Sequence, residues 1–305
     1  MGPKVYIIIL NYVNWEDTIE CLNSLESLSY DNYETIVIDN CSPNKSFQEL
    51  QKYISSKPSY SVHLILSPDN GGFAKGNNLG LSYAQNRADG NYYWLLNNDT
   101  VVQKDSLLTL VGQAEKEKAN KTGLFGSKLR YYHHPDILQA VGAKYNKWFG
   151  IVKETGNLEI DNFQYDNLQS ADFLPGASFL ISHACLKEIG IMDENLFLYF
   201  EELDWAERAR RTGWKIRLVP KSIVFHKHGA SIKSSGLQKN EKSLLSDFYF
   251  WRNKLIITRK YYPYCLLTVY LSYIFTIVNR LIRGQGNRIG ILLNILVRYK
   301  TIKWK

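Results

Sequence analysis

The last 58 residues of the chain, 248–305, contain no aspartate and no glutamate, although they carry 11 lysines and arginines. Residues 1–247 hold 26 basic against 29 acidic residues, so the formal net charge of +8 arises in the C-terminal segment. A uniformly basic nucleic-acid-binding protein does not divide its charge in this way. We therefore expect no nucleic-acid partner, and instead an anionic surface that the chain meets at one end.

Cysteine is scarce, and a long apolar N-terminal run is absent. The four cysteines, Cys21, Cys41, Cys185 and Cys265, do not have the spacing of metal ligands, which favours a reduced, cytoplasmic protein. The apolar run at 5–10 is too short for the hydrophobic region of a secretory signal. Hydrophobic residues make up 45% and charged residues 22% of the 305 residues, which excludes disordered and collagen-like classes.

The first 120 residues alternate short apolar runs with helix-like segments. Apolar runs at 5–10, 34–40, 61–67 and 92–97 precede helical patterns at 14–28, 46–54, 75–86 and 105–118. This order predicts a parallel sheet covered by helices on both faces, in which ligands bind at the carboxyl ends of the strands.

The second half of the chain is less regular. Residues 124–169 have no assignable pattern, and 133–135 is expected to be a surface loop. Residues 172–181 predict a strand entered through a Pro-Gly turn, and 201–213 predict a helix that ends at a glycine. Two short strands are expected at 215–219 and 222–226, and the composition of 233–240 is typical of a linker.

Polar residues follow each of the four apolar runs. They are Asn11-Tyr12, Asp39-Asn40, Asp69-Asn70-Gly71-Gly72 and Asn97-Asn98-Asp99. Turn chemistry explains one such cluster, but four at the same edge of one sheet favour a ligand site. The glycines after Asn70 allow close backbone approach, yet they form neither a Walker A loop nor a spaced G-x-G-x-x-G, so a triphosphate or NAD site is not supported.

Seven motifs between residues 4 and 232 identify a family. They are NYVNWEDTIECLNSL, IVIDNCS, NGGFAKGNN, LLNNDT, FLPGASFLI, FLYFEELDWAERARRTGW and VFHKHGAS, in this order. Together they resemble the inverting family 2 glycosyltransferases, particularly the rhamnosyltransferase-like branch that builds bacterial surface polysaccharides. The resemblance implies the α/β fold called GT-A, with a Rossmann-like mixed, mostly parallel sheet and helices on both faces.

The same resemblance suggests the domain limits. A GT-A domain is expected at 1–235, with a donor half at about 1–100 and an acceptor half at about 101–235. A basic, apolar, helical and membrane-associating segment is expected at 236–305.

The resemblance also implies a nucleotide-sugar site at the sheet edge. Asp39 corresponds to the residue that accepts a hydrogen bond from N3–H of uracil or thymine, although an Asx turn into residues 41–43 is the alternative. Lys75 has a solvated surface position as its alternative. The expected donor-binding residues are Asn11, Tyr12, Asp39, Asn40, Asn70, Gly72, Lys75, Asn97 and Asn98.

A divalent cation, Mg²⁺ or Mn²⁺, is the implied cofactor. Asn97-Asn98-Asp99 stands where the family has its D-x-D motif, with Asn97 in place of the first aspartate. Asp99 is the expected direct ligand, because hard cations prefer carboxylate oxygen. His226 is the second expected ligand, with His228 as its alternative.

The Glu-Glu-Leu-Asp-Trp run is expected to supply the general base that deprotonates the acceptor hydroxyl. The family uses the second residue of a Glu-Asp pair, which corresponds to Glu202 in this chain. Glu201 is the alternative base. Asp204 is a further catalytic candidate, but its spacing from Arg208 also predicts an i,i+4 ion pair.

Residues 261–279 carry no charge and are just long enough to span a bilayer. Pro263 and five tyrosines interrupt the run, which favours a helix lying in the membrane interface. A membrane span and a helix in a soluble homodimer stay open as alternatives.

These observations predict a metal-dependent inverting glycosyltransferase at the inner, cytoplasmic face of the cell membrane. The expected donor is dTDP-rhamnose, with a UDP-sugar next, and the expected acceptor is a hydroxyl of a polysaccharide or a lipid-linked oligosaccharide. A non-catalytic GT-A scaffold or glycan-binding subunit is the alternative, because Asn97 and Glu202 depart from the family pattern. A nucleotidyltransferase and a processive synthase are excluded, since their motifs are missing.

Overall fold

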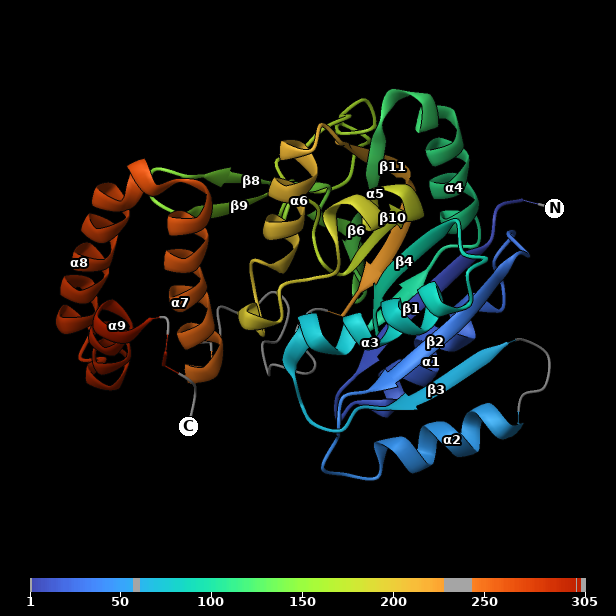
Figure 1. The fold of residues 1–305 in the computed structure, drawn as a ribbon, viewed down its shortest axis with the longest axis horizontal. Coiled ribbons are helices and arrows are strands. Elements are labelled where there is room, and N and C mark those ends of the chain that lie inside the picture. Colours follow the sequence, from blue (N-terminus) through green and yellow to red (C-terminus); the bar gives the residue numbers. More distant parts are fainter. Residues whose placement is uncertain (1, 57–60, 228–242, 300, 303–305) are drawn as a thin grey trace.

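A mixed sheet forms the body of the protein (Figure 1). The computed structural model describes residues 2–56, 61–227, 243–299 and 301–302. Within these residues the strand order is β3-β2-β1-β4-β10-β6-β11-β5, with β7 paired to β6, and β8 and β9 form a separate hairpin. The strands are β1 (Val5–Asn11), β2 (Tyr33–Asp39), β3 (Val62–Leu66), β4 (Tyr92–Asn97), β5 (Thr100–Val102), β6 (Thr122–Tyr131), β7 (His134–Ala140), β8 (Gly142–Asn146), β9 (Ile151–Thr155), β10 (Ser178–Ser182) and β11 (Lys215–His226).

Strands β1 to β4 are mutually parallel, as the sequence predicts. Strand β10 then runs antiparallel between β4 and β6, which makes the sheet mixed. The helices of the body are α1 (Trp15–Leu25), α2 (Ser46–Ser56), α3 (Gly72–Asn86), α4 (Ser106–Glu117), α5 (His183–Ile189) and α6 (Glu201–Arg211), with short 3₁₀ turns η1 (Lys118–Asn120) and η2 (Glu194–Leu196). The predicted fold class is confirmed.

The continuous apolar run of β1 is explained by burial on both faces of the sheet. Tyr6 and Ile8 belong to the core beneath α3, α5 and α6, whereas Val5, Ile7 and Ile9 belong to the core beneath α1, α2 and α4. Successive side chains of a strand point to opposite faces, so a central strand must be apolar at every position.

The irregular sequence at 124–169 contains four strands, β6 to β9. The hairpin β8–β9 is partly exposed, and polar or charged residues interrupt both of its strands, so it has no long apolar run. The two short strands expected at 215–219 and 222–226 are one strand, β11, which bulges between Val219 and Ile223. Pro220 lies in this bulge, because proline has no N–H to donate to a ladder. His134 and Pro135, expected in a loop, begin β7 as exposed residues.

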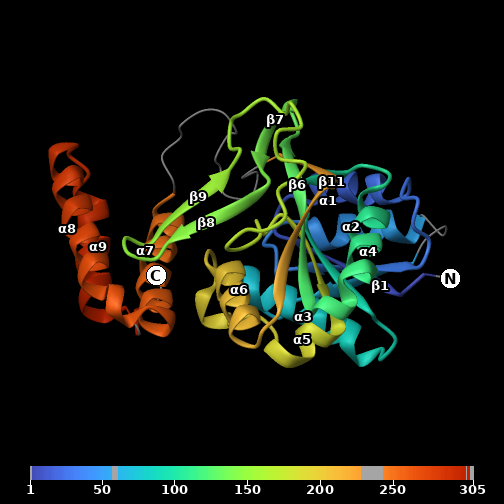
Figure 2. The ribbon, with the colours of Figure 1, turned by 90° about the horizontal axis from the view of Figure 1, so that it is seen from above.

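The C-terminal segment forms a helical bundle of α7 (Leu244–Tyr261), η3 (Pro263–Cys265), α8 (Leu266–Ile282) and α9 (Gly286–Arg298). Its own core consists of Phe248, Leu255, Val269, Tyr273, Leu292 and Ile295. Figures 1 and 2 show the bundle at one end of the molecule, where the hairpin β8–β9 reaches toward it. Of the described residues, one helical stretch, Pro263–Ile282, is long and apolar enough to cross a membrane. The expected linker at 233–240 lies outside the described residues.

Candidate active site

The polar residues that follow β1, β2 and β4 meet at one edge of the sheet. Asn11 is the register partner of Asp39, and Asn97 is the partner of Leu10 on the other side of β1. Three of the four sequence clusters are therefore brought together by strand pairing alone.

The carboxylate of Asp39 is fully buried and fastens the loops after β1 and β2. It accepts hydrogen bonds from Nδ2 of Asn11 at 2.6 Å and from the N–H and Oγ–H of Ser42 at 2.9 and 2.8 Å. Ser42 Oγ in turn accepts from the N–H of Val13, which has a positive φ of 61°. The Asp39 side chain thus caps the turn at 41–43 by a bond to the N–H three residues on, and Ser42 is a residue of this site that sequence reasoning missed.

Asn40 contributes a buried acceptor at the same edge. Its Nδ2 donates to Oδ1 of Asn70 at 2.9 Å and to the carbonyl of Gly72 at 3.3 Å. Its Oδ1 is buried and has no hydrogen-bond partner among the described residues. A buried unsatisfied carbonyl is costly, so this atom is suited to accept a hydrogen bond from a bound ligand.

The glycine loop after β3 is constrained by packing. Gly72 has a φ of +80°, and a Cβ there would come within 2.3 Å of the carbonyl oxygen of Phe197. The N–H of Phe73 donates a hydrogen bond to the same carbonyl at 2.6 Å, which joins the start of α3 to the segment before α6. Lys75 is paired with the exposed carboxylate of Asp69 at 2.8 Å, and Tyr12 is partly exposed.

Asp99 and His226 face each other at the ends of β4 and β11. Oδ1 of Asp99 lies 3.0 Å from Nε2 of His226, and the side chain of Asn97 lies 3.4 Å from the same nitrogen. Nδ1 of His226 lies 2.8 Å from Oε1 of Gln139, and an amide oxygen only accepts, so this nitrogen carries the proton. Gln139 in β7 thus fixes the ring so that Nε2 points to Asp99.

This pair fits a divalent cation. Two ligand atoms at right angles and about 2.1 Å from one ion lie about 3.0 Å apart, which is the separation of Asp99 Oδ1 and His226 Nε2. No group of three or more His, Cys, Asp or Glu side chains suited to a metal occurs in the described part of the chain. The remaining ligands would be diphosphate oxygens and water, as is common for Mg²⁺. His228 lies outside the described residues.

Asn98 has a different environment from its two neighbours. Its buried Nδ2 donates to Thr18 Oγ1 at 3.1 Å and to the carbonyl of Asn14 at 3.2 Å. These contacts tie the end of β4 to the start of α1, so its amide nitrogen is already engaged inside the protein.

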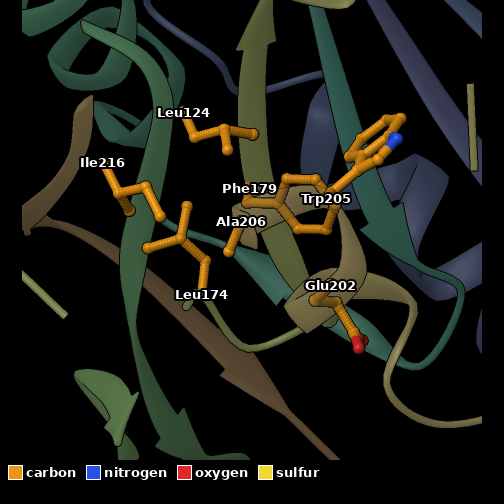
Figure 3. Close-up of a pocket in the computed structure, with 7 residues that line it drawn as sticks. All are labelled: Leu124, Leu174, Phe179, Glu202, Trp205, Ala206 and Ile216. Atoms are coloured by element: carbon orange, nitrogen blue, oxygen red, sulfur yellow. The ribbon is translucent and has the colours of Figure 1, made fainter. Parts of the chain in front are cut away.

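Glu202 lies in the first turn of α6, and apolar residues pack on one side of it. Figure 3 shows its carboxylate pointing away from a small apolar void lined by Leu124, Leu174, Phe179, Trp205, Ala206 and Ile216. The pKa of Glu202 is raised to about 7, chiefly by burial; its backbone N–H bond lowers the pKa, and the Glu154 charge makes a smaller raising contribution. A carboxyl group with a pKa near neutrality is well matched to proton transfer.

A series of contacts connects Glu202 to the Asp99–His226 pair. Its Oε1 lies so close to Gly176 that an added Cβ there would be 1.9 Å away. The next residue, Ala177, accepts a hydrogen bond from the N–H of Asn97 at 3.0 Å. Two adjacent residues of the motif at 172–181 therefore border the candidate base and the Asn97–Asp99 loop.

The other two acids of α6 have different surroundings. Glu201 is buried, and its Oε1 has no partner among the described residues. Burial, and next the Glu202 charge, raise its pKa well above the usual value. Asp204 is also buried and pairs with Arg208 at 2.8 Å, as its spacing predicts, and additionally with Lys260 and Tyr261, both at 2.6 Å. Asp204 thus joins α6 to α7.

The first part of the chain matches a known family profile. Residues 6–154 match the profile described as glycosyl transferase family 2. A low-salt glycan biosynthesis hexosyltransferase of Haloferax volcanii is 26% identical over 215 residues, which are 69% of this chain and 63% of the relative, so the chain spans less than two thirds of that relative's length.

Two further relatives are matched over most of their length. A dTDP-rhamnosyl transferase of Shigella flexneri is 22% identical over 95% of this chain and 92% of its own length. A rhamnosyltransferase of Escherichia coli K12 is 24% identical over 84% of this chain and 96% of its own length.

Solved structures show the same fold. GalNAc-T7 with UDP, GalNAc and Mn²⁺ aligns with a TM-score of 0.63 and 17% identity, over 82% of this chain and 47% of that one. The Pyrobaculum calidifontis mannosyltransferase PcManGT, in complex with GDP-Man and Mn²⁺, aligns with a TM-score of 0.57 and 12% identity, over 100% and 89%. Staphylococcus aureus TarS 1-349 in complex with UDP-GlcNAc aligns with a TM-score of 0.53 and 18% identity, over 83% of this chain and 66% of that one. At these identities the likeness concerns the GT-A fold.

Proposed function

We propose that this chain is a family 2 glycosyltransferase, the family whose profile residues 6–154 match, and that it is a metal-dependent inverting enzyme that transfers a sugar from a nucleoside diphosphate to an acceptor hydroxyl. One observation carries the proposal. Oε1 of Glu202 borders Gly176, and the next residue, Ala177, accepts a hydrogen bond from the N–H of Asn97, two residues before Asp99 of the Asp99–His226 pair. Inverting transfer requires a base on one side of the anomeric carbon and a cation at the diphosphate on the other, and these contacts support Glu202 and the Asp99–His226 pair in those two roles.

The donor end of the site is the edge formed by β1, β2 and β4. The orphaned Oδ1 of Asn40 is suited to a donor group of the nucleotide, a base N–H or a ribose hydroxyl. Asp39 has three internal hydrogen bonds, and a carboxylate has about four acceptor positions, so one position is available for the base. The names of the Shigella and Escherichia relatives favour dTDP-rhamnose over a UDP-sugar as the donor.

Asp99 and His226 would hold the divalent cation, which neutralises the charge that develops on the departing diphosphate. Glu202 accepts the proton of the acceptor hydroxyl. The hydroxyl oxygen then forms a bond to the anomeric carbon as the bond from that carbon to the diphosphate oxygen breaks, with inversion. Because the pKa of Glu202 is about 7, a large fraction of this carboxyl group is ionised at neutral pH.

The acceptor half and the C-terminal bundle support a lipid-linked oligosaccharide or surface polysaccharide as acceptor. The bundle carries the basic charge of the chain and its long apolar helix. We place the protein at the inner face of the cell membrane as a peripheral protein. The GT-A domain at 1–235, with halves at about 1–100 and 101–235, is proposed as the catalytic unit.

Thermal unfolding with thymidine, uridine and guanosine diphosphates, each with and without Mn²⁺, tests the proposal. A ligand at a hundred times its Kd adds about 2.7 kcal/mol to the free energy of unfolding. We expect one nucleotide to raise Tm only when Mn²⁺ is present, and Asp99→Ala to lose that rise. If no nucleotide raises Tm with or without metal, the proposed donor site is wrong.

A further inference from the structure

One side of α8 is an unpartnered apolar face. Its exposed apolar residues are Leu267, Leu271, Ile274, Phe275, Val278, Leu281 and Ile282, with 73%, 75% and 81% of Leu267, Phe275 and Ile282 accessible. Their spacing of three and four residues places them along one stripe of the helix. The opposite side of α8 buries Val269, Tyr273 and Arg280 in the bundle.

The tip of the β8–β9 hairpin extends this stripe. Trp148, Phe149 and Ile151 are exposed at the tip, although the hairpin belongs to the body of the protein. The Trp148 ring packs edge-on against Tyr264 at 5.9 Å, and Thr268 donates a hydrogen bond to the Trp148 carbonyl. Figures 1 and 2 show the hairpin reaching the bundle. We call these three tip residues, Tyr264 and the α8 stripe the docking face.

The charge around the docking face is basic. Lys144 in β8 and Lys153 in β9 are both exposed and are direct cross-strand partners. Like charges directly opposite each other destabilise a hairpin in water, so this pair is favourable only beside an anion. Arg283 and Arg298 are exposed on the bundle, and residues 248–305 contain no acid.

The contacts of α8 oppose a transmembrane orientation. Arg280 in α8 forms a buried ion pair with Asp247 of α7 at 2.7 Å, and Arg288 of α9 lies 3.3 Å from the same carboxylate. Tyr273 and Ser272 are hydrogen-bonded to α7 as well. A span would draw these charged groups into hydrocarbon or break the bundle, whereas a helix lying in the interface keeps every one of these contacts.

We propose that the docking face binds the surface of an anionic phospholipid bilayer, with α8 in the plane of the interface and Trp148 and Phe149 inserted beside it. Aromatic residues next to basic side chains are typical of interfacial anchors. The inference deepens the proposed function, because it rests on an acceptor that is presented at a membrane. A bilayer accounts for both the apolar stripe and the opposed lysines, while a second copy of this chain would bring its own basic charge to the same place.

Sedimentation of the full chain with vesicles tests the proposal. We expect binding to vesicles of equal parts phosphatidylglycerol and phosphatidylcholine, little binding to phosphatidylcholine alone, and weaker binding at higher salt. Trp148→Ser with Phe149→Ser should lower the partition by at least about tenfold, since two aromatic side chains lose their burial in the interface. Leu271→Gln with Phe275→Gln should have a similar effect. The matched control is Leu66→Gln with Leu108→Gln, which alters two exposed leucines of β3 and α4.

A second double variant separates membrane binding from folding. Lys144→Gln with Lys153→Gln should lower the partition into anionic vesicles by about fivefold for each lysine. Its Tm should be unchanged or higher, because the repulsion between the two side chains is removed. A merely structural role for these lysines would lower Tm instead.

Several results would overturn the proposal. Equal binding to neutral and anionic vesicles is one, and wild-type binding by the Trp148→Ser, Phe149→Ser variant is another. A dimer in solution that Leu271→Gln with Phe275→Gln makes monomeric would point to a second copy of the chain instead. Vesicle-bound protein that resists alkaline extraction would indicate a spanning helix. Nucleotide-induced stabilisation, measured on the same variants, reports on the donor site independently. Asp99→Ala should lose that stabilisation and keep full vesicle binding, so failure of either idea is recognisable by itself.

Discussion

The carboxamide of Asn253 in α7 donates a hydrogen bond to the carbonyl oxygen of Tyr199, two residues before the acidic pair of α6, at 3.0 Å. The same buried group donates to the carbonyls of Leu196 and Leu198 at 2.6 and 2.9 Å. Phe197, Tyr199 and Phe200 all have positive φ values, between 59° and 75°. Such conformations are strained in non-glycine residues and persist only when the surroundings impose them. The C-terminal bundle therefore holds the backbone that aims Glu202.

Asn253→Ala should accordingly impair catalysis through position. The variant removes the side-chain donor of the Leu196, Leu198 and Tyr199 carbonyls, although Leu196 keeps the N–H of Leu198, and we expect a loss of about 2–3 kcal/mol in the free energy of unfolding. We also expect kcat to fall between about tenfold and a hundredfold, as misplacement of a reacting group does, with nucleotide Kd unchanged.

Tyr273→Phe is the matched control for Asn253→Ala. It removes one hydrogen bond to the carbonyl of Trp251 within the bundle and does not touch the 196–200 segment. It should lower Tm while kcat stays at the wild-type value. Equal loss of kcat in the two variants would mean that general instability, and not the aim of Glu202, accounts for the defect.

Gln139 should tune the affinity for metal. Replacement of Gln139 by Leu frees Nδ1 of His226, which loses its fixed orientation, and loss of such a partner raises the metal concentration required by about ten- to a hundredfold. Titration of Tm with Mn²⁺ at a saturating nucleotide concentration measures this. Gln139→Glu keeps an oxygen acceptor and should restore most of the affinity. The same Mn²⁺ requirement in Gln139→Leu and wild type would exclude this role.

The sequence predicts the parts of this site that local pattern and strand pairing determine. The apolar runs at 5–10 and 34–40 become neighbouring parallel strands, and their ends bring Asn11 and Asp39 together. The helix predicted at 201–213 is α6, which ends at Arg211, two residues before Gly213, whose φ is +82°.

The residues that escaped prediction act across long sequence separations. Gln139 reaches His226 only because β7 pairs with β6, and β6 with β11, both with irregular register. Asn253 lies in α7, and the local sequence of α7 predicts only that it is a helix. The side chain of Asn253 nevertheless donates a hydrogen bond to a segment more than fifty residues earlier in the chain. Neither residue stands in a motif, so no local signal distinguishes it from other polar residues.

Gly176 should be required for the position of Glu202. An alanine methyl group would meet Oε1 of Glu202 at 1.9 Å and force the carboxylate to move. We expect Gly176→Ala to lower kcat by at least about tenfold, with nucleotide-induced stabilisation retained. Gly112→Ala is the control, since no atom lies within 4 Å of its added Cβ in α4, and it should raise stability by about 0.5–1 kcal/mol. Full activity in Gly176→Ala would remove the proposed contact from the mechanism.

Glu202 should make the rate depend on pH near neutrality. A general base must be ionised, and its pKa is raised to about 7, so kcat/KM should rise with pH and level off above about pH 8. Glu202→Gln should lose transfer by a factor of about 10²–10⁴ and keep nucleotide binding, because the amide has nearly the same shape. Unchanged turnover in this variant would exclude Glu202 as the base.

Glu201 should make stability depend on pH in the opposite sense to an ordinary ion-paired acid. Its folded-state pKa is raised above the unfolded value by burial and by the neighbouring Glu202 charge. The folded protein therefore binds more protons than the unfolded chain, and stability falls as pH rises from the unfolded pKa toward the folded one. Each unit of difference between the two pKa values corresponds to about 1.4 kcal/mol. Glu201→Gln carries no titrating proton, so its Tm relative to wild type should increase between pH 5 and pH 8. Parallel Tm curves for the two proteins over this range would show that Glu201 is ionised in the folded state, and the orphaned Oε1 would then require a cationic or hydrogen-bonding ligand to occupy it.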